Sequence, residues 1–409
     1  MKLKLNNQKL LAAIKKTERF YDKKDISCIT SHYLFEADAE NSILKITATD
    51  YEFGLTQIIR NVAVETSGRA TAPAKKFGDI LKKIGKDDEI VLEVEKNDLF
   101  LRVGKFNFNL AMFNYEEFPA LKLESEYPLN IDSEVFKRKL KLLSHAMDKN
   151  NPKLSLNGIH LSVRADKFAF AATETHRLAV SYVEAQNTKT YDINIPAKAV
   201  VEMQRLFEGD VKLFVADTLG HNEEGPCVLN EALLLAKTDE FEFFTKLIND
   251  KFPNFERVIP TQINETIALN KSEMRENLKK MAICSNKLAI NFRLDGKVIY
   301  QSLCFDNDGV RAEFDKALPL RDNFVLGVKA DYLNDFLSEV DENQFTLKLN
   351  EESATFIAQS NEFFECIVPI LNFLTKEDVE KFGFLHQDKN LLPKEADEQK
   401  VQETPNEVA

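Results

Sequence analysis

The residues most able to do chemistry in this chain lie together at positions 173–177, which read Thr-Glu-Thr-His-Arg. A glutamate close to a histidine could act as a general acid and base in hydrolysis. That chemistry also needs a nucleophile or a partner acid, and the sequence supplies no matched residue of either kind. We therefore interpret the cluster as structural, and we predict no catalytic residue and no enzymatic activity.

Two pairs of acidic residues could suggest metal ligands, Asp50 with Glu52 and Asp306 with Asp308. No third ligand accompanies either pair, and the six histidines show no H-E-x-x-H or comparable spacing. The 13 glycines form neither of the glycine-rich motifs that cradle nucleotide phosphates. The sequence thus predicts no metal and no cofactor. A metal-dependent hydrolase of repeated α+β domains stays an alternative that convergent ligands would support.

The bulk composition is that of a globular protein. The chain has 409 residues, 44% hydrophobic and 29% charged, which suits two to four domains. No apolar run approaches the ~20 residues that a membrane-spanning helix needs, and the first residues lack the apolar core of a secretory signal. The five cysteines are scattered and form no C-x-x-C pair, as is typical of a reducing compartment. We expect a cytoplasmic protein with no membrane partner.

One helix-start pattern occurs three times along the chain. Asn6, Asp132 and Asn270 are good N-cap residues, and each precedes an amphipathic helix. A second amphipathic helix follows in each copy, with β-prone segments around it. These second helices are predicted near residues 73–84, 196–207 and 329–340.

The repeat predicts an α+β fold of three two-helix, β-sheet domains. Their predicted bounds are 1–125, 126–262 and 263–372, followed by a tail at 373–409 whose polar end predicts disorder.

The repeated helices carry a basic face opposite their apolar face. For one helix alone, lysines on the exposed side usually serve solubility. The same placement recurs in most of the six predicted helices of a chain with net charge -12, which indicates a concentrated positive surface. Lysine binds phosphates without reading bases, so we expect sequence-independent contact with double-stranded DNA. The residues predicted to face DNA are Lys9, Lys15, Lys16, Lys75, Lys76, Lys82, Lys83, Lys137, Arg138, Lys141, Lys198, Arg205, Arg275 and Lys279.

Four stretches carry a resemblance to a known family. They are residues 156–158 (Leu-Asn-Gly), 172–180 (which contain Thr-His-Arg-Leu-Ala), 195–198 (Ile-Pro-Ala-Lys) and 246–260. In this order and at these separations, they indicate that the sequence resembles the β subunit of bacterial DNA polymerase III over residues 1 to about 372.

The resemblance implies a DNA clamp fold and a head-to-tail homodimer that closes into a six-domain ring. It implies a non-catalytic processivity factor, a sliding clamp that encircles double-stranded DNA. The implied partners are the DNA polymerase III catalytic subunit, the clamp loader, and other polymerases and repair proteins that carry short hydrophobic peptide motifs. A DNA-free interaction scaffold is the remaining alternative.

The resemblance also implies two sites. At the dimer interface, Phe108 and Leu110 of one copy would meet Ile283 and Cys284 of the other. The partner-peptide pocket would comprise Leu156, Thr173, His176, Leu178, Pro253, Arg257, Val258, Ile367, Val368, Pro369 and Ile370.

The chain departs from the family pattern in several places. Thr175 stands where the family usually has glycine. Residues 219–235 are longer than expected and predict an enlarged loop with a short helical piece. The tail after Asn372 is additional, and both an inert tail and one that folds back on the pocket are open.

Overall fold

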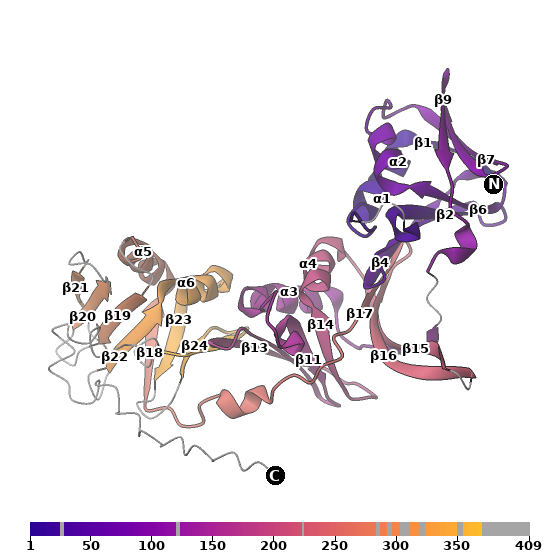
Figure 1. Ribbon diagram of the computed structural model, residues 1–409. Helices are drawn as coiled ribbons and strands as arrows, with labels where there is room; N and C mark the ends of the chain where they lie inside the picture. The colour runs from indigo at the N-terminus through magenta and orange to yellow at the C-terminus, as the bar shows by residue number, and fades with distance from the viewer. Residues whose placement is uncertain are drawn as a thin grey trace, which may run out of the picture. The chain divides into compact units, whose positions relative to one another are not determined.

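The computed structural model describes residues 1–24, 28–119, 123–222, 225–283, 287–292, 297–302, 311–316, 318, 324–349 and 355–369. Its internal contacts form two compact units (Figure 1). Unit 1 comprises Met1–Ala172 and Tyr182–Pro253, and unit 2 comprises Thr173–Ser181 and the described part of Asn254–Ala409. The predictions for Cys284, Ile370, Asp306, Asp308 and the tail fall outside the described residues.

Unit 1 is built on antiparallel sheets. The order β5-β1-β7-β8-β9 joins the strands Ala63–Thr66, Lys2–Asn6, Glu89–Glu95, Asp98–Val103 and Phe106–Ala111. The order β10-β15-β16-β17-β4-β3-β2-β6 joins Leu123–Pro128, Lys212–Asn222, Gly225–Lys237, Phe241–Lys246, Phe53–Arg60, Ile43–Thr49, His32–Asp38 and Gly68–Pro73. The order β14-β11-β12 joins Tyr191–Pro196, Gly158–Val163 and Lys167–Thr173.

Unit 2 is also antiparallel. The order β13-β25-β24-β23-β18 joins Arg177–Glu184, Phe364–Ile367, Phe356–Gln359, Gln344–Leu349 and Glu265–Asn270. The order β21-β20-β19-β22 joins Arg311–Asp315, Lys297–Ser302, Lys287–Phe292 and Phe324–Lys329.

Helices pack in pairs against these sheets, and Figure 1 labels each of them. The pairs are α1 (Asn7–Thr17) with α2 (Ala74–Leu81), α3 (Ser133–Leu143) with α4 (Ala197–Leu206), and α5 (Lys271–Met281) with α6 (Ala330–Glu339). Short 3-10 turns are η1 (Ile29–Ser31), η2 (Tyr115–Glu117), η3 (Ser144–Ala146), η4 (Leu154–Leu156) and η5 (Phe255–Val258). The repeated two-helix pattern of the sequence is therefore confirmed.

Side-chain hydrogen bonds to the backbone confirm the three predicted N-caps. The side-chain oxygen of Asn6 accepts from the backbone N–H of Gln8 at 2.8 Å. Asp132 accepts in the same way at the start of α3, and Asn270 at the start of α5. Each cap satisfies backbone donors that the first helical turn leaves without a partner, so the helix begins at the same place in each copy.

The apolar stripe of each helix is buried in the protein core. Its buried members include Leu10, Ile14, Phe77, Phe136, Leu140, Met203, Met274, Leu278, Phe336 and Leu337. Burying one Leu or Phe side chain contributes roughly 1.5–3 kcal/mol, which exceeds the differences in helix propensity between residues. The spacing of these residues therefore decides which face of each helix is exposed.

The two N-terminal predicted domains share one sheet. Strand β17 pairs with β4, with Phe243 opposite Leu55. The backbone N–H of Lys246 also donates to the carbonyl of Glu52 at 2.8 Å. Since this ladder crosses the predicted boundary at residue 125, the structure groups both segments in unit 1. The division into three domains stays a prediction.

The Leu-Asn-Gly motif fixes the start of α4. The carbonyl of Asn157 accepts from the N–H of Ala197, and its side chain donates to the carbonyl of Asn151, both at 2.9 Å. A Cβ atom on Gly158 would lie 2.0 Å from the carbonyl oxygen of Ile195, so only glycine lets β11 and β14 approach this closely.

The enlarged loop predicted at residues 219–235 is wrong. These residues extend strands β15 and β16, whose pairing continues outward to Asn222 opposite Gly225. A hairpin extension needs no helical segment, because the two strands form backbone hydrogen bonds with each other at alternate residue pairs.

Candidate functional site

The basic face of unit 1 is clearest on α1 and α2. Lys9 and Lys15 on α1, and Lys75 and Lys76 on α2, are exposed opposite the buried stripe. Within the described part of the chain, several of the predicted DNA-facing lysines form no ion pair. They are Lys9, Lys15, Lys75, Lys76, Lys83, Lys141 and Lys279. Such ammonium groups are available to phosphates.

Two other basic side chains of α1 and α2 have acidic neighbours. Lys16 lies 3.7 Å from Glu240, and Lys82 lies 3.1 Å from Glu18. Both lysines remain about half exposed, so these ion pairs are weak in water and leave the cations accessible.

One of the basic side chains of α3 forms a hydrogen bond within the protein. The ammonium of Lys137 donates to the carbonyl of Phe207 at 2.6 Å, where α4 ends. Arg138 is half-buried, while Lys141 is exposed. Lysine at a helix C-terminus satisfies a free carbonyl, which gives Lys137 a structural role that the sequence did not reveal.

The basic residues of α4 lie beside carboxylates. The ammonium of Lys198 lies 2.5 Å from Asp50 and 4.0 Å from the ring centre of Phe53. Arg205 pairs with Glu202 at 2.9 Å. These neighbours lower the net positive charge of this face.

On α5, Lys279 is exposed and Arg275 is half-buried. None of the residues predicted to face DNA lies on α6, which begins directly after Lys329. Unit 2 therefore presents a sparser basic face than unit 1.

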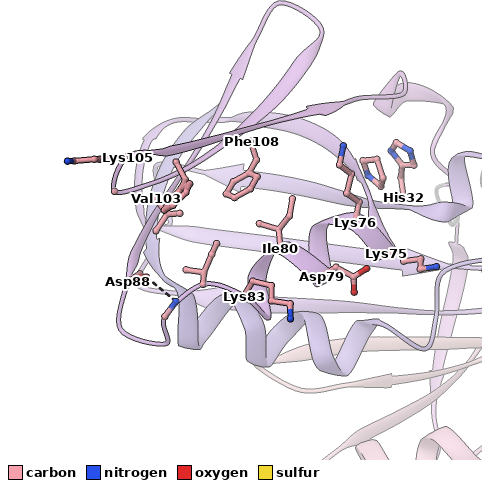
Figure 2. Close-up of a pocket in the computed structure, with 15 residues that line it drawn as sticks. His32, Lys75, Lys76, Asp79, Ile80, Lys83, Asp88, Val103, Lys105 and Phe108 are labelled. Atoms are coloured by element: carbon pink, nitrogen blue, oxygen red, sulfur yellow. Dashed lines mark hydrogen bonds between the residues drawn. The ribbon is translucent and has the colours of Figure 1, made fainter.

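A cavity of about 1170 Å³ opens between α2 and the β8–β9 hairpin (Figure 2). Its apolar lining includes Ile80, Ile84, Val103, Phe106 and Phe108. Its polar lining consists of Lys75, Lys76, Lys83, Lys105, Asp79, Asp88 and His32. The cavity thus combines an apolar floor with an excess of positive charge. Burial lowers the pKa of His32 to about 4, so this imidazole is neutral at pH 7.

Strand β9 is the edge of its sheet and offers one large exposed side chain. Phe106 is 70% exposed and stacks on Phe108, with the ring centres 6.4 Å apart. Leu110, predicted to contact a second copy, is fully buried in its own sheet, so that assignment is corrected. Phe106 replaces it as the exposed residue on the same face of the strand. The Phe-Asn-Phe alternation was the sequence signal for it.

In unit 2, Ile283 is 82% exposed just beyond the end of α5. Single exposed aliphatic side chains are common on protein surfaces, so the dimer contact of Ile283 stays a prediction.

Five of the predicted pocket residues lie side by side in unit 2. The turn that carries Thr173 and His176 leads into β13, which pairs with β25 so that Leu178 lies opposite Cys366. The N–H of Val368 donates to the carbonyl of His176 at 2.9 Å. Leu178 on β13 and Ile367 on β25 therefore lie on adjacent strands, with Thr173 at the end of β12 and with His176 and Val368 just beyond the paired residues. Ile367 is fully buried and lies opposite Arg177, so its side chain points to the other face of the sheet from Leu178.

The other pocket residues are placed separately. Arg257 and Val258 lie exposed on η5 of unit 2, and Pro369 follows β25. Leu156 is buried and Pro253 is exposed, and both belong to unit 1.

The side chains of the cluster at 173–177 make contacts that indicate a structural role. The carboxylate of Glu174 lies 3.6 Å from Arg177, while the ring of His176 lies 3.3 Å from the hydroxyl of Thr175. Asp50 likewise accepts from the backbone of Phe53 at 3.1 Å, as a turn residue does. Among the described residues, no group of three His, Cys, Asp or Glu side chains could hold a metal ion.

Thr175 has a backbone φ of 85°, in the left-handed region that β-branched residues avoid. Such strain costs roughly 1–3 kcal/mol, and glycine would remove it at the expense of a more flexible unfolded chain. We expect Thr175→Gly to raise the free energy of unfolding by about 1 kcal/mol, measured by urea denaturation. Thr266→Gly, in the regular strand β18, is the matched control and should be destabilising. Equal losses in both variants would mean that Thr175 is not strained.

Comparison with known proteins points to a single family. The N-terminal domain of the DNA polymerase III beta subunit matches residues 1–122, and the central domain of the same subunit matches residues 130–254. The Beta sliding clamp of Helicobacter pylori J99 is 26% identical over 369 residues, 88% of this chain and 94% of the relative. That of Pseudomonas aeruginosa is 26% identical over 371 residues, 87% of this chain and 95% of the relative.

Solved structures share the fold. The Helicobacter pylori beta clamp bound to a DNA ligase peptide has a TM-score of 0.78 at 24% identity, covering 90% of this chain and 100% of that one. The DNA polymerase III subunit beta of Pseudomonas aeruginosa has a TM-score of 0.79 at 23% identity, covering 90% and 99%. In the described part of this chain, no helix is long and apolar enough to cross a membrane.

Proposed function

Since this chain belongs to the family of DNA polymerase III β subunits, the β sliding clamps, we propose that two copies close into a ring around double-stranded DNA. The protein is a sliding clamp, a non-catalytic processivity factor of DNA replication. It works in the cytoplasm, where it holds the DNA polymerase III catalytic subunit on its template. The clamp loader and other polymerases and repair proteins are its further partners.

The observation that supports this proposal best is the row of exposed lysines on the repeated helices. Lys9, Lys15 and Lys141 of unit 1 point into water without an acidic partner among the described residues. Lysine ammonium groups attract the phosphate backbone without fixing a register, so a duplex inside the ring can slide. The acidic remainder of a chain with net charge -12 repels DNA elsewhere.

The ring closes, in this proposal, at the cavity beside β9. Phe106 and Phe108 form an apolar surface there, and Ile283 of a second copy supplies the complementary side chain. An edge strand also offers unpaired backbone groups for sheet extension. Lys75, Lys76 and Lys83 line the same cavity, so a second copy would cover part of these predicted DNA-facing residues.

Partner peptides bind, in the same proposal, on the surface around His176, Leu178 and Val368. Apolar side chains flanked by few polar groups suit short segments with hydrophobic anchors. The Helicobacter pylori relative in complex with a DNA ligase peptide supports this class of ligand.

Binding to short, open duplex DNA tests the lysine face. We expect weak affinity that falls steeply with salt, because phosphate contacts release counterions. In the variant Lys9→Gln, Lys15→Gln, Lys141→Gln, the slope of log affinity against log salt should decrease by about one for each lysine that contacts a phosphate. Fluorescence anisotropy at several salt concentrations measures it.

The matched control neutralises three exposed lysines outside the helices, Lys96, Lys189 and Lys212. Its slope should stay close to that of the unchanged protein. Equal slopes in the two triple variants would show that net charge alone, and not the helix face, governs binding.

A further inference from the structure

A buried arginine links the turn at 173–176 to a helix and to a neighbouring strand. The Arg177 side chain is only 6% exposed at the start of β13. Its Nη1 atom lies 2.9 Å from Asp335 on α6 and 3.9 Å from Glu365 on β25. Its Nε atom lies 3.6 Å from Glu174 in the turn itself. One guanidinium thus contacts three separate elements of unit 2.

The contacts are charged and mostly shielded from water. Glu365 is fully buried, and Glu174 is about three-quarters buried. Opposite charges attract more strongly where water is excluded, and the planar guanidinium requires a defined geometry of its partners. The position of the turn is therefore tied to the position of α6.

Tyr332 completes the arrangement from α6. Its ring lies 4.5 Å from the guanidinium carbon of Arg177, and its hydroxyl accepts a hydrogen bond from Lys329 at 3.2 Å. Burial and hydrogen bonding to Glu174 raise the pKa of the Tyr332 hydroxyl, so the phenol stays neutral and presents a π face to the cation.

Arg177 does not lie on the surface proposed to bind peptides. Successive side chains of a strand point to opposite faces, so Leu178 points away from Arg177. Arg177 acts on that surface through the backbone: its carbonyl accepts from the Thr173 hydroxyl at 2.6 Å, and the same hydroxyl accepts from the N–H of Thr175 at 3.1 Å. The turn that results includes the left-handed residue Thr175.

We propose that Arg177 is a positioning residue, which uses Asp335, Glu365 and Glu174 to hold the His176 turn in the shape that binds partner peptides. This inference rests on the proposed peptide site. A strained backbone persists only where its surroundings determine it fully, and the Arg177 contacts provide that constraint around Thr175. Movement of α6 is thereby coupled to the peptide-binding surface.

The test compares peptide affinity with fold stability. The probe is a fluorescein-labelled DNA ligase peptide with hydrophobic anchors, and the readout is anisotropy with the full-length protein. Asp335→Asn keeps the size of a partly exposed side chain, so it should fold. We expect its affinity to fall about tenfold, with a similar loss in Arg177→Gln and a partial recovery in Arg177→Lys.

The control is Glu276→Gln, which makes the same change of carboxylate to amide in an exposed pair with Lys280 on α5. It should leave peptide affinity unchanged. Hydrogen exchange supplies a second readout: the amides of residues 175–178 should exchange faster in Asp335→Asn, while those of β23 keep their rate.

A purely structural role for Arg177 predicts a different result. Affinity within twofold of the unchanged protein in folded Asp335→Asn and Arg177→Lys, with unaltered exchange at 175–178, would overturn the inference. If the unchanged protein binds no peptide, the proposed peptide site fails as well. If the unchanged protein binds the peptide and the variants bind it with the same affinity, the proposed peptide site stands and only the role of Arg177 is rejected.

Discussion

After loading onto nicked circular DNA, the protein should stay bound through extended washing and dissociate once the circle is cut. A closed ring holds DNA by topology, so its retention does not depend on the strength of the lysine contacts. On the circle we expect a lifetime at least about tenfold longer than on the cut molecule, because weak phosphate contacts alone exchange rapidly. Gel filtration of labelled protein before and after restriction cleavage measures the difference.

Two controls distinguish a closed ring from simple surface binding. Linear DNA with both ends blocked by a bulky protein should retain the ring as a circle does, since the ring cannot slide off. Raising the salt concentration should remove protein bound to open duplex but leave the protein on circles. Equal retention on circular and open linear DNA would contradict the clamp and favour the DNA-free scaffold or simple surface binding.

Changing Phe106 to aspartate should separate the two copies. Phe106 is 70% exposed in the single chain, so its replacement leaves the core of unit 1 intact. An aromatic side chain at the centre of an interface can contribute about 2 kcal/mol or more, and an aspartate there would lose its hydration when a second copy covers it. We expect the dimer dissociation constant to rise at least about 100-fold, as measured by analytical ultracentrifugation.

The matched control is Val135→Asp, which places the same charge on an exposed apolar residue in the first turn of α3. A carboxylate near a helix N-terminus is tolerated, so this variant should fold and remain dimeric. Phe106→Asp should also lose its retention on circular DNA, because an open ring dissociates as easily from a circle as from a line. A fully dimeric Phe106→Asp protein would exclude β9 as the site of closure.

The sequence by itself determined the local features. Asn6, Asp132 and Asn270 begin helices because their side chains bond to backbone donors two or three residues away. The buried stripe of each helix follows from the spacing of its apolar residues, since burial of those residues outweighs other local preferences. These interactions span a few residues and need no knowledge of the fold, so the three repeats were recognisable from their pattern.

The tertiary structure decided what depends on distant partners. Alternation places Phe106 and Leu110 on one face of β9, but only the packed sheet shows that Leu110 is covered and Phe106 is not. Lys137 and Lys198 look like their exposed neighbours in the sequence, and their partners Phe207 and Asp50 lie 70 and 148 positions away.

The contacts of Arg177 were also decided by the tertiary structure. Asp335 lies 158 residues further along the chain, and the pairing of β13 with β25 brings Glu365 alongside. The topology of the sheets and the helices packed on them decide which charged groups meet. Residues so far apart in the sequence are brought together by the whole core, because no local pattern can specify a contact over such a distance.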